Sequence, residues 1–115
     1  MTKTLPRSAL ADPVVRGLIV DYVRRLLPAI PPGVHLESWH RTWDENVAAK
    51  GKPESQHLLG LATDWTGTEK ALDTLAIRAR RQGLHPFKGV SPRTGTRLLH
   101  VQRFPAGALR QLGLI

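Results

Sequence analysis

The chain has 115 residues, of which 41% are hydrophobic and 23% charged, an ordinary composition for a globular protein with a single core. It has no cysteine, which excludes disulfides, thiolate metal ligands and a cysteine nucleophile. No apolar run approaches the roughly 18 residues needed to span a bilayer, and no secretory signal is visible. We therefore predict one domain over residues 1–115, with residues 1–10 as an N-terminal tail.

The net charge is +8, from 17 Lys and Arg against 9 acidic residues. Such a surface attracts polyanions such as nucleic acid, anionic lipid or an anionic cell-wall polymer, although a solubilising surface with no partner explains the charge equally well. The basic residues are scattered, apart from runs at 24–25 and 78–81. They are not interleaved with aromatic residues, so there is no stacking platform for single strands, and we do not expect a nucleic-acid partner.

The first half of the chain predicts a long helix, a strand and a short helix. Asp12 is a good N-cap, and Pro13 suits the first helical position. Apolar residues then recur at helical spacing until Pro28 (Val14, Val15, Leu18, Ile19, Tyr22, Val23 and Leu26). Residues 34–39 alternate apolar and polar, which is typical of a strand, and residues 42–49 resemble a short helix.

The second half predicts a further helix and a hairpin. Thr66 and Glu69 have the spacing of a capping box, and Gly83 closes the helix that follows. One face of this helix is apolar (Leu72, Leu75, Ala76 and Ala79). Residues 84–87 and 97–102 are strand candidates joined by a Gly/Ser/Pro loop, and a short helix follows Pro105. This order predicts an α+β fold, a small antiparallel sheet flanked by helices.

The segment from Ser55 to Asp64 carries the strongest chemical signal. His57 and Asp64 are two residues of the types that bind zinc, and His100 is the candidate third ligand. Gly60 permits a sharp bend between the first two, and Ala62 leaves room for close packing beneath a metal.

Strand alternation would let His100 face a cleft while Leu99 and Val101 enter the core. His85 is an alternative third ligand, and it is also a candidate substrate contact.

Five residues match the pattern Ser-x-His-x-x-Gly-x-Ala-x-Asp (Ser55, His57, Gly60, Ala62 and Asp64). With Ser38-x-x-Arg41 and Asn46 upstream, residues 33–103 resemble the zinc D-Ala-D-Ala carboxypeptidase family, whose fold the hedgehog signalling domain shares. The resemblance implies that fold and Zn²⁺ bound by His57, Asp64 and His100. It also implies that Arg41 stabilises the oxyanion or holds a substrate carboxylate, and that Ser55 supports the site or binds substrate.

One feature of the family is absent. Its members place a carboxylate three residues before or two residues after the third ligand, as general base for the attacking water. Here those positions hold Arg97 and Gln102. By strand periodicity Gln102 lies on the same face as His100, but an amide cannot accept the proton of the attacking water. Acids near the motif in sequence are Glu37, Asp44 and Glu54, and the general base stays unassigned.

Two functional hypotheses follow. The first is a zinc peptidase that cleaves peptidoglycan stem peptides as a D-alanyl carboxypeptidase or endopeptidase, with Arg41 and Gln102 as candidate catalytic residues. Without a visible signal peptide, we expect a phage-derived protein, cytoplasmic until lysis or associated with a virion. The second is a catalytically impaired member of the fold that acts as a structural or binding protein, for example as a virion component with an assembly partner.

Overall fold

The computed structural model describes residues 9–91 and 93–114. The elements in chain order are the 3-10 turn η1 (Ala9–Ala11), α1 (Pro13–Leu26), η2 (Leu27–Ala29), β1 (Val34–Ser38), α2 (Trp43–Ala48), η3 (Gln56–Leu59), β2 (Ala62–Gly67), α3 (Glu69–Arg81), β3 (His85–Val90), β4 (Arg97–Gln102) and α4 (Ala108–Gln111). Residues 1–8 of the predicted tail lie outside the described residues, and its remainder begins η1. No helix in the described ranges is long and apolar enough to cross a membrane.

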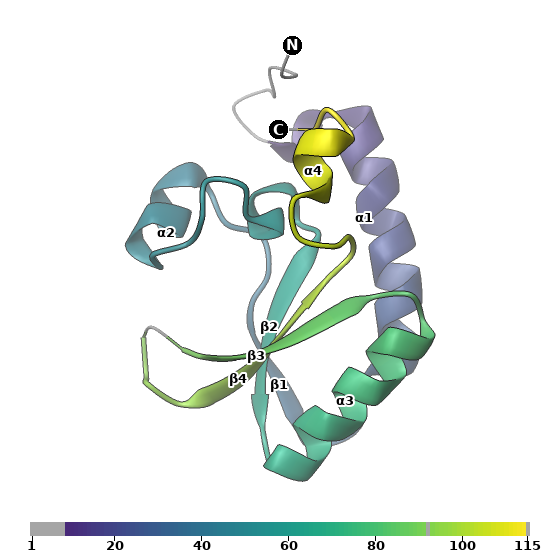
Figure 1. The fold of residues 1–115 in the computed structure, drawn as a ribbon, viewed down its shortest axis with the longest axis vertical. Coiled ribbons are helices and arrows are strands. Elements are labelled where there is room, and N and C mark those ends of the chain that lie inside the picture. The colour runs from purple at the N-terminus through teal and green to yellow at the C-terminus, as the bar shows by residue number, and fades with distance from the viewer. Residues whose placement is uncertain (1–8, 92, 115) are drawn as a thin grey trace.

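The four strands form one antiparallel sheet in the order β1-β2-β4-β3, so the predicted α+β class is confirmed. The predicted hairpin is the β3–β4 pair, and the predicted bounds of β4 are those observed. Helices α1 and α3 lie on one side of the sheet, whereas α2 stands apart from them (Figure 1). The core fills the space between these two helices and the strands β2 and β4.

Helix α1 begins where the sequence predicted, because the Asp12 carboxylate accepts a hydrogen bond from the Val14 backbone N–H at 2.8 Å. Its buried face is formed by Val15, Tyr22 and Leu26. Val14, predicted to share the apolar stripe, is 57% exposed. Consecutive helical residues are about 100° apart, so a face centred on Val15 and Tyr22 turns Val14 toward solvent.

Helix α3 buries the four residues that the sequence predicted, Leu72, Leu75, Ala76 and Ala79. The predicted capping box is wrong, however, because the N-cap is Thr68, whose Oγ1 accepts from the Ala71 N–H at 3.1 Å. Thr66 is still within β2, where it pairs with His35 of β1. A capping box does form at α2, between Thr42 and Glu45.

A buried hydrogen-bond network ties α1 to the core side of β2 and β4. The Tyr22 hydroxyl donates to the Val101 carbonyl at 2.6 Å and lies 2.8 Å from Thr63 Oγ1. The Trp65 indole donates to the same Thr63 oxygen at 2.7 Å. Because Thr63 and Val101 are paired across β2 and β4, this network backs the strand positions next to Asp64 and His100.

Candidate metal centre

His57 lies in the 3-10 turn η3, whose local sequence sets its position. Ser55 caps the turn, and its Oγ accepts from the His57 N–H at 3.2 Å. Gly60 ends the turn with a φ of 72°, a left-handed conformation that favours glycine. A Cβ at Gly60 would also lie 3.1 Å from Ile19 Cδ1 on α1. The bend predicted at Gly60 is therefore confirmed, and it turns the chain from His57 into β2.

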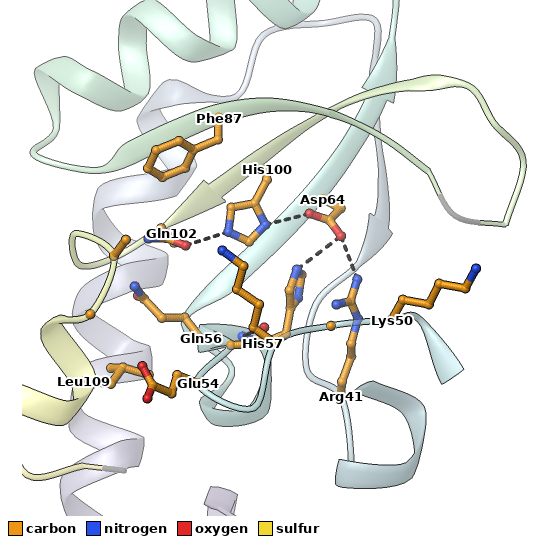
Figure 2. A pocket seen from close by; sticks show the side chains of 15 residues that line it. Arg41, Lys50, Glu54, Gln56, His57, Asp64, Phe87, His100, Gln102 and Leu109 are labelled. Atoms are coloured by element: carbon orange, nitrogen blue, oxygen red, sulfur yellow. Dashed lines mark hydrogen bonds and ion pairs between the residues drawn. The ribbon is translucent and has the colours of Figure 1, made fainter. Parts of the chain in front are cut away.

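Asp64 on β2 lies directly opposite His100 on β4, and His57 meets them from η3 (Figure 2). Asp64 Oδ1 is 2.9 Å from His100 Nδ1, and Asp64 Oδ2 is 3.1 Å from His57 Nε2. One ligand atom from each residue can be chosen so that all three lie within 4.8 Å of one another. The structure thus brings together the three residues that the sequence singled out as metal ligands.

In each imidazole, the ring nitrogen that points away from Asp64, here called the outer nitrogen, lies within hydrogen-bond distance of an acceptor. His57 Nδ1 lies 2.6 Å from the Trp39 carbonyl oxygen, and a carbonyl only accepts, so Nδ1 carries the proton. The Gln102 amide nitrogen donates to the Phe104 carbonyl at 2.8 Å, which turns its oxygen toward His100. His100 Nε2 therefore donates to Gln102 Oε1, at 2.7 Å.

In the neutral form of each ring, the nitrogen that faces Asp64 then presents a lone pair to the carboxylate. His57 Nε2 is buried and has no hydrogen-bond partner among the described residues, although Asp64 Oδ2 is 3.1 Å away. A lone pair facing a carboxylate oxygen is repulsive unless a cation or an added proton lies between them. Histidine ligands of metals usually donate their other N–H to a carbonyl or a carboxylate, which is the arrangement found here. The donor set fits a divalent transition metal such as Zn²⁺.

Asp64 is ionised in this environment. Its burial raises the pKa, but hydrogen bonds and charge from His100 and His57, when these rings carry an added proton, outweigh that effect and hold the pKa of the carboxyl well below its usual range. The side chain is therefore a negative group that either a metal ion or a protonated imidazole can balance. Three protein ligands of this kind are typical of catalytic zinc sites.

Arg41 supports the same carboxylate. Its terminal nitrogen donates to Asp64 Oδ2 at 2.8 Å, and its Nε donates to Ser38 Oγ at 3.2 Å. Its backbone N–H donates to the His57 carbonyl at 2.9 Å, so main chain and side chain both contact the centre. The guanidinium thus orients Asp64 from the wall of the pocket, where the sequence expected an oxyanion or carboxylate contact.

The three candidate ligands line an open pocket of about 490 Å³. Ser55 and Gln102, both predicted site residues, also line it. Apolar side chains of Phe87 and Leu109 form part of the wall, and the Phe87 ring centre is 6.2 Å from that of His100 (Figure 2). The pocket therefore offers a ligand an apolar surface beside the candidate metal position.

The structure does not group His85 with the candidate metal ligands, and its role as a substrate contact stays a prediction. His85 lies on β3 opposite Gln102, but it is not part of the candidate metal-ligand group found among the described residues. The described residues that line the pocket do not include it either. His100 is the third member of the group because it pairs directly with Asp64 across β2 and β4.

The structure separates the three acids considered as general base. Glu37 accepts from Ser91 Oγ at 2.5 Å, and Asp44 lies in the first turn of α2. Among the described residues that line the pocket, Glu54 is the one acid besides Asp64, and it pairs with Arg110. Figure 2 shows Glu54 beside Leu109, away from the His100 ring. None of the three is in contact with the ligand group.

The acceptors that orient the imidazoles were missed by sequence reasoning. They are backbone carbonyls of Trp39 and Phe104, one acting directly and one through Gln102. Gln56 helps to hold Phe104 in place, since it donates to that carbonyl at 2.7 Å and accepts from its N–H at 3.0 Å. Every residue has a carbonyl, so no side-chain pattern could have indicated these two.

No family model, curated protein or solved structure matches this chain. The centre itself consists of two imidazoles, one ionised carboxylate and an open, partly apolar pocket beside them.

Proposed function

We propose that this protein is a zinc-dependent peptidase that cleaves peptidoglycan stem peptides as a D-alanyl carboxypeptidase or endopeptidase. The observation that carries the proposal is the orientation of the imidazoles. Each donates its outer N–H to a fixed acceptor, so that in the neutral form of the rings His57 Nε2 and His100 Nδ1 face the Asp64 carboxylate with their lone pairs. This arrangement is stable when a cation lies among the three ligands.

Bound Zn²⁺ supplies a Lewis acid that polarises a peptide carbonyl and lowers the pKa of water. The protein contributes the rest. Arg41 keeps Asp64 oriented and adds positive charge next to the position where negative charge develops on the substrate. Phe87 offers an apolar surface to a small side chain such as that of alanine. The site faces the open side of the sheet, as a hydrolytic centre requires.

The family resemblance of residues 33–103 supplies the substrate class and the hedgehog-like fold in this proposal. Such an enzyme meets its substrate at the cell wall. The proposal includes a phage-derived protein, released by lysis or carried in a virion, as the source of the enzyme.

A second function, zinc binding without catalysis in a structural or binding protein, is favoured by one observation. Both polar ends of the Gln102 amide are engaged, with His100 and with the Phe104 carbonyl. The position at which the family places a carboxylate base thus holds a group that orients a ligand. In this alternative, the protein keeps the metal centre for stability or assembly.

Metal analysis of the purified full chain tests the centre that both functions share. We expect about one equivalent of zinc, lost in His57→Ala and retained in His85→Ala, the matched control outside the ligand group. Stoichiometric zinc with chelator-sensitive hydrolysis of purified peptidoglycan would support the peptidase. Zinc with no hydrolysis would favour the second function, and a protein that binds no zinc would refute both.

A further inference from the structure

The loop between α2 and η3, residues 49–55, forms one wall of the pocket beside the metal centre. Both of its lysines, Lys50 and Lys52, line the pocket, and Arg41 lies on the same lining. Figure 2 shows Lys50 on the side of Arg41, with its side chain extended away from the imidazoles. We call residues 49–55 the lysine loop.

The lysine loop is held in place by Asn46, which is only 1% exposed. The Asn46 side-chain amide donates to the Lys52 carbonyl at 2.9 Å, and its backbone carbonyl accepts from the Gly51 N–H at 2.8 Å. A Cβ at Gly51 would lie 2.0 Å from Asn46 Oδ1, so only glycine fits between the two lysines. The position of the lysine backbone is thus fixed by a buried side chain.

The backbone at Lys50 adopts a rare conformation. Its φ of 56° is the one positive value among the non-glycine residues that the structure describes. A left-handed conformation is unfavourable for a residue with a Cβ and is held here by the C-terminal cap of α2. The Lys50 N–H donates to the Val47 carbonyl at 3.0 Å, and the Gly51 N–H donates to the Asn46 carbonyl at 2.8 Å. Both lysines of this cap and loop border the same pocket.

The charges around the pocket do not balance. Of its two acids, Asp64 is engaged by Arg41 and both histidines, and Glu54 is engaged by Arg110. Within residues 9–91 and 93–114, no acidic side chain pairs with Lys50 or Lys52. A concave site with unpaired cations concentrates anions, because its low-dielectric walls focus the field. The electrostatic environment of the pocket therefore favours a negatively charged ligand.

We propose that Lys52, with Lys50 at the rim, forms a subsite that binds a carboxylate of the substrate next to the metal centre. The proposal rests on the proposed peptidase function and narrows its substrates to peptides with a carboxylate beside the cleaved bond. That carboxylate is either the C-terminus or an acidic side chain. The apolar surface of Phe87 then contacts the uncharged part of the same residue.

Ligand binding to the full chain, followed by NMR shifts of backbone amides, tests the subsite without any turnover. The probes are N-acetyl-D-alanine, N-acetyl-glutamic acid 1-amide and the uncharged N-acetyl-D-alaninamide. We expect a carboxylate probe to shift the Gly51 and Lys52 amides, and the uncharged amide to bind more weakly. Lys52→Gln should weaken carboxylate binding about three- to tenfold, and Lys50→Gln less. The matched control, Lys70→Gln on α3, should have no effect.

The titrations are run with zinc and again with chelator, so that the subsite and the metal centre are judged separately. The dependence on Lys52 should appear in both conditions, and the tighter carboxylate probe identifies the source of the carboxylate. Equal binding of the acid and the amide, or unchanged binding in Lys52→Gln, would overturn the subsite even in a zinc-loaded protein. Lysine-dependent binding to a chain that takes up no zinc would keep the subsite and refute the peptidase.

Discussion

Gln102 and His100 lie on the same face of β4, with Gln102 Oε1 at 2.7 Å from His100 Nε2. The amide cannot turn over, because its nitrogen donates to the Phe104 carbonyl at 2.8 Å. The pair therefore determines which nitrogen of His100 faces Asp64, and with it the ligand atom that a metal would meet. Gln102 therefore supports the candidate metal centre by orienting His100.

Replacing Gln102 with leucine tests this support. The His100 ring then loses the acceptor that holds its proton on Nε2, and we expect zinc affinity to fall by about 10- to 100-fold. Competition with a chromogenic chelator measures the change, and Gln111→Leu on the exposed face of α4 serves as control. Unchanged zinc affinity in Gln102→Leu would show that the amide does not orient His100.

The buried network around Tyr22 predicts a change in stability at neutral pH. Tyr22→Phe leaves the Val101 carbonyl without its donor, while Thr63 still accepts from Trp65. An unsatisfied buried acceptor costs about 1–3 kcal/mol, and we expect the free energy of unfolding to fall by that amount. Urea denaturation at pH 7 measures it. An equally stable variant would show that the network contributes nothing to the fold.

The same residue predicts the alkaline limit of the fold. Burial raises the pKa of Tyr22 above the ordinary tyrosine value. The unfolded chain therefore loses the Tyr22 proton near pH 10 while the folded chain keeps it, and stability falls as the pH rises further, by about 1.4 kcal/mol per pH unit. In Tyr22→Phe this loss is absent, so the stability gap should narrow at alkaline pH. Tyr22 is the only tyrosine, so tyrosinate absorbance follows its ionisation directly.

An ion pair between α1 and the segment after β4 predicts a loss of stability in acid. A hydrogen bond from Arg103, helped by Arg25 and opposed by desolvation, lowers the pKa of Asp21. A lowered pKa stabilises the fold above the unfolded value near 4, and the effect is lost as the pH falls below it. Because the pair is partly exposed, Asp21→Asn should cost less than about 1 kcal/mol at pH 7 and nothing near pH 2.

Thermal unfolding at both pH values measures the effect of Asp21→Asn. Asp73→Asn is the matched control, since Asp73 forms an exposed ion pair with Lys88, at 3.6 Å. A larger loss in Asp73→Asn than in Asp21→Asn would contradict the role given to Arg103.

Helix α1 offers a stabilising change far from the candidate site. Gly17 is exposed in the middle of the helix, and a Cβ added there would meet no atom within 4 Å. Alanine loses less backbone freedom on folding than glycine, so Gly17→Ala should stabilise the protein by about 0.5–1 kcal/mol. A rise of a few degrees in Tm, with unchanged zinc uptake, is the expected result. A lower Tm would show that this face of α1 has a packing partner.

Local patterns predicted α3 and β4 well, whereas they gave no strand at β2 and ended β3 at residue 87 instead of Val90. The apolar residues of α3 and the bounds of β4 were predicted correctly, because helical and strand periodicity directly reflect which side meets the core. The start of α3 was placed two residues early, because Thr66 and Thr68 are both acceptable N-caps by sequence. The pairing of β2 with β1 decided between them by keeping Thr66 in the sheet.

The sequence alone determined the types of candidate ligand, since imidazole and carboxylate chemistry belongs to histidine and aspartate whatever the fold, but it left both His85 and His100 as candidates beside His57 and Asp64. Only the tertiary structure decided which atoms of these residues face one another. Backbone carbonyls from distant segments, at Trp39 and Phe104, set the orientation of the rings, and Asn46 set the conformation of the lysine loop. Hydrogen bonds of this kind depend on where the chain returns in space, which a local pattern does not encode.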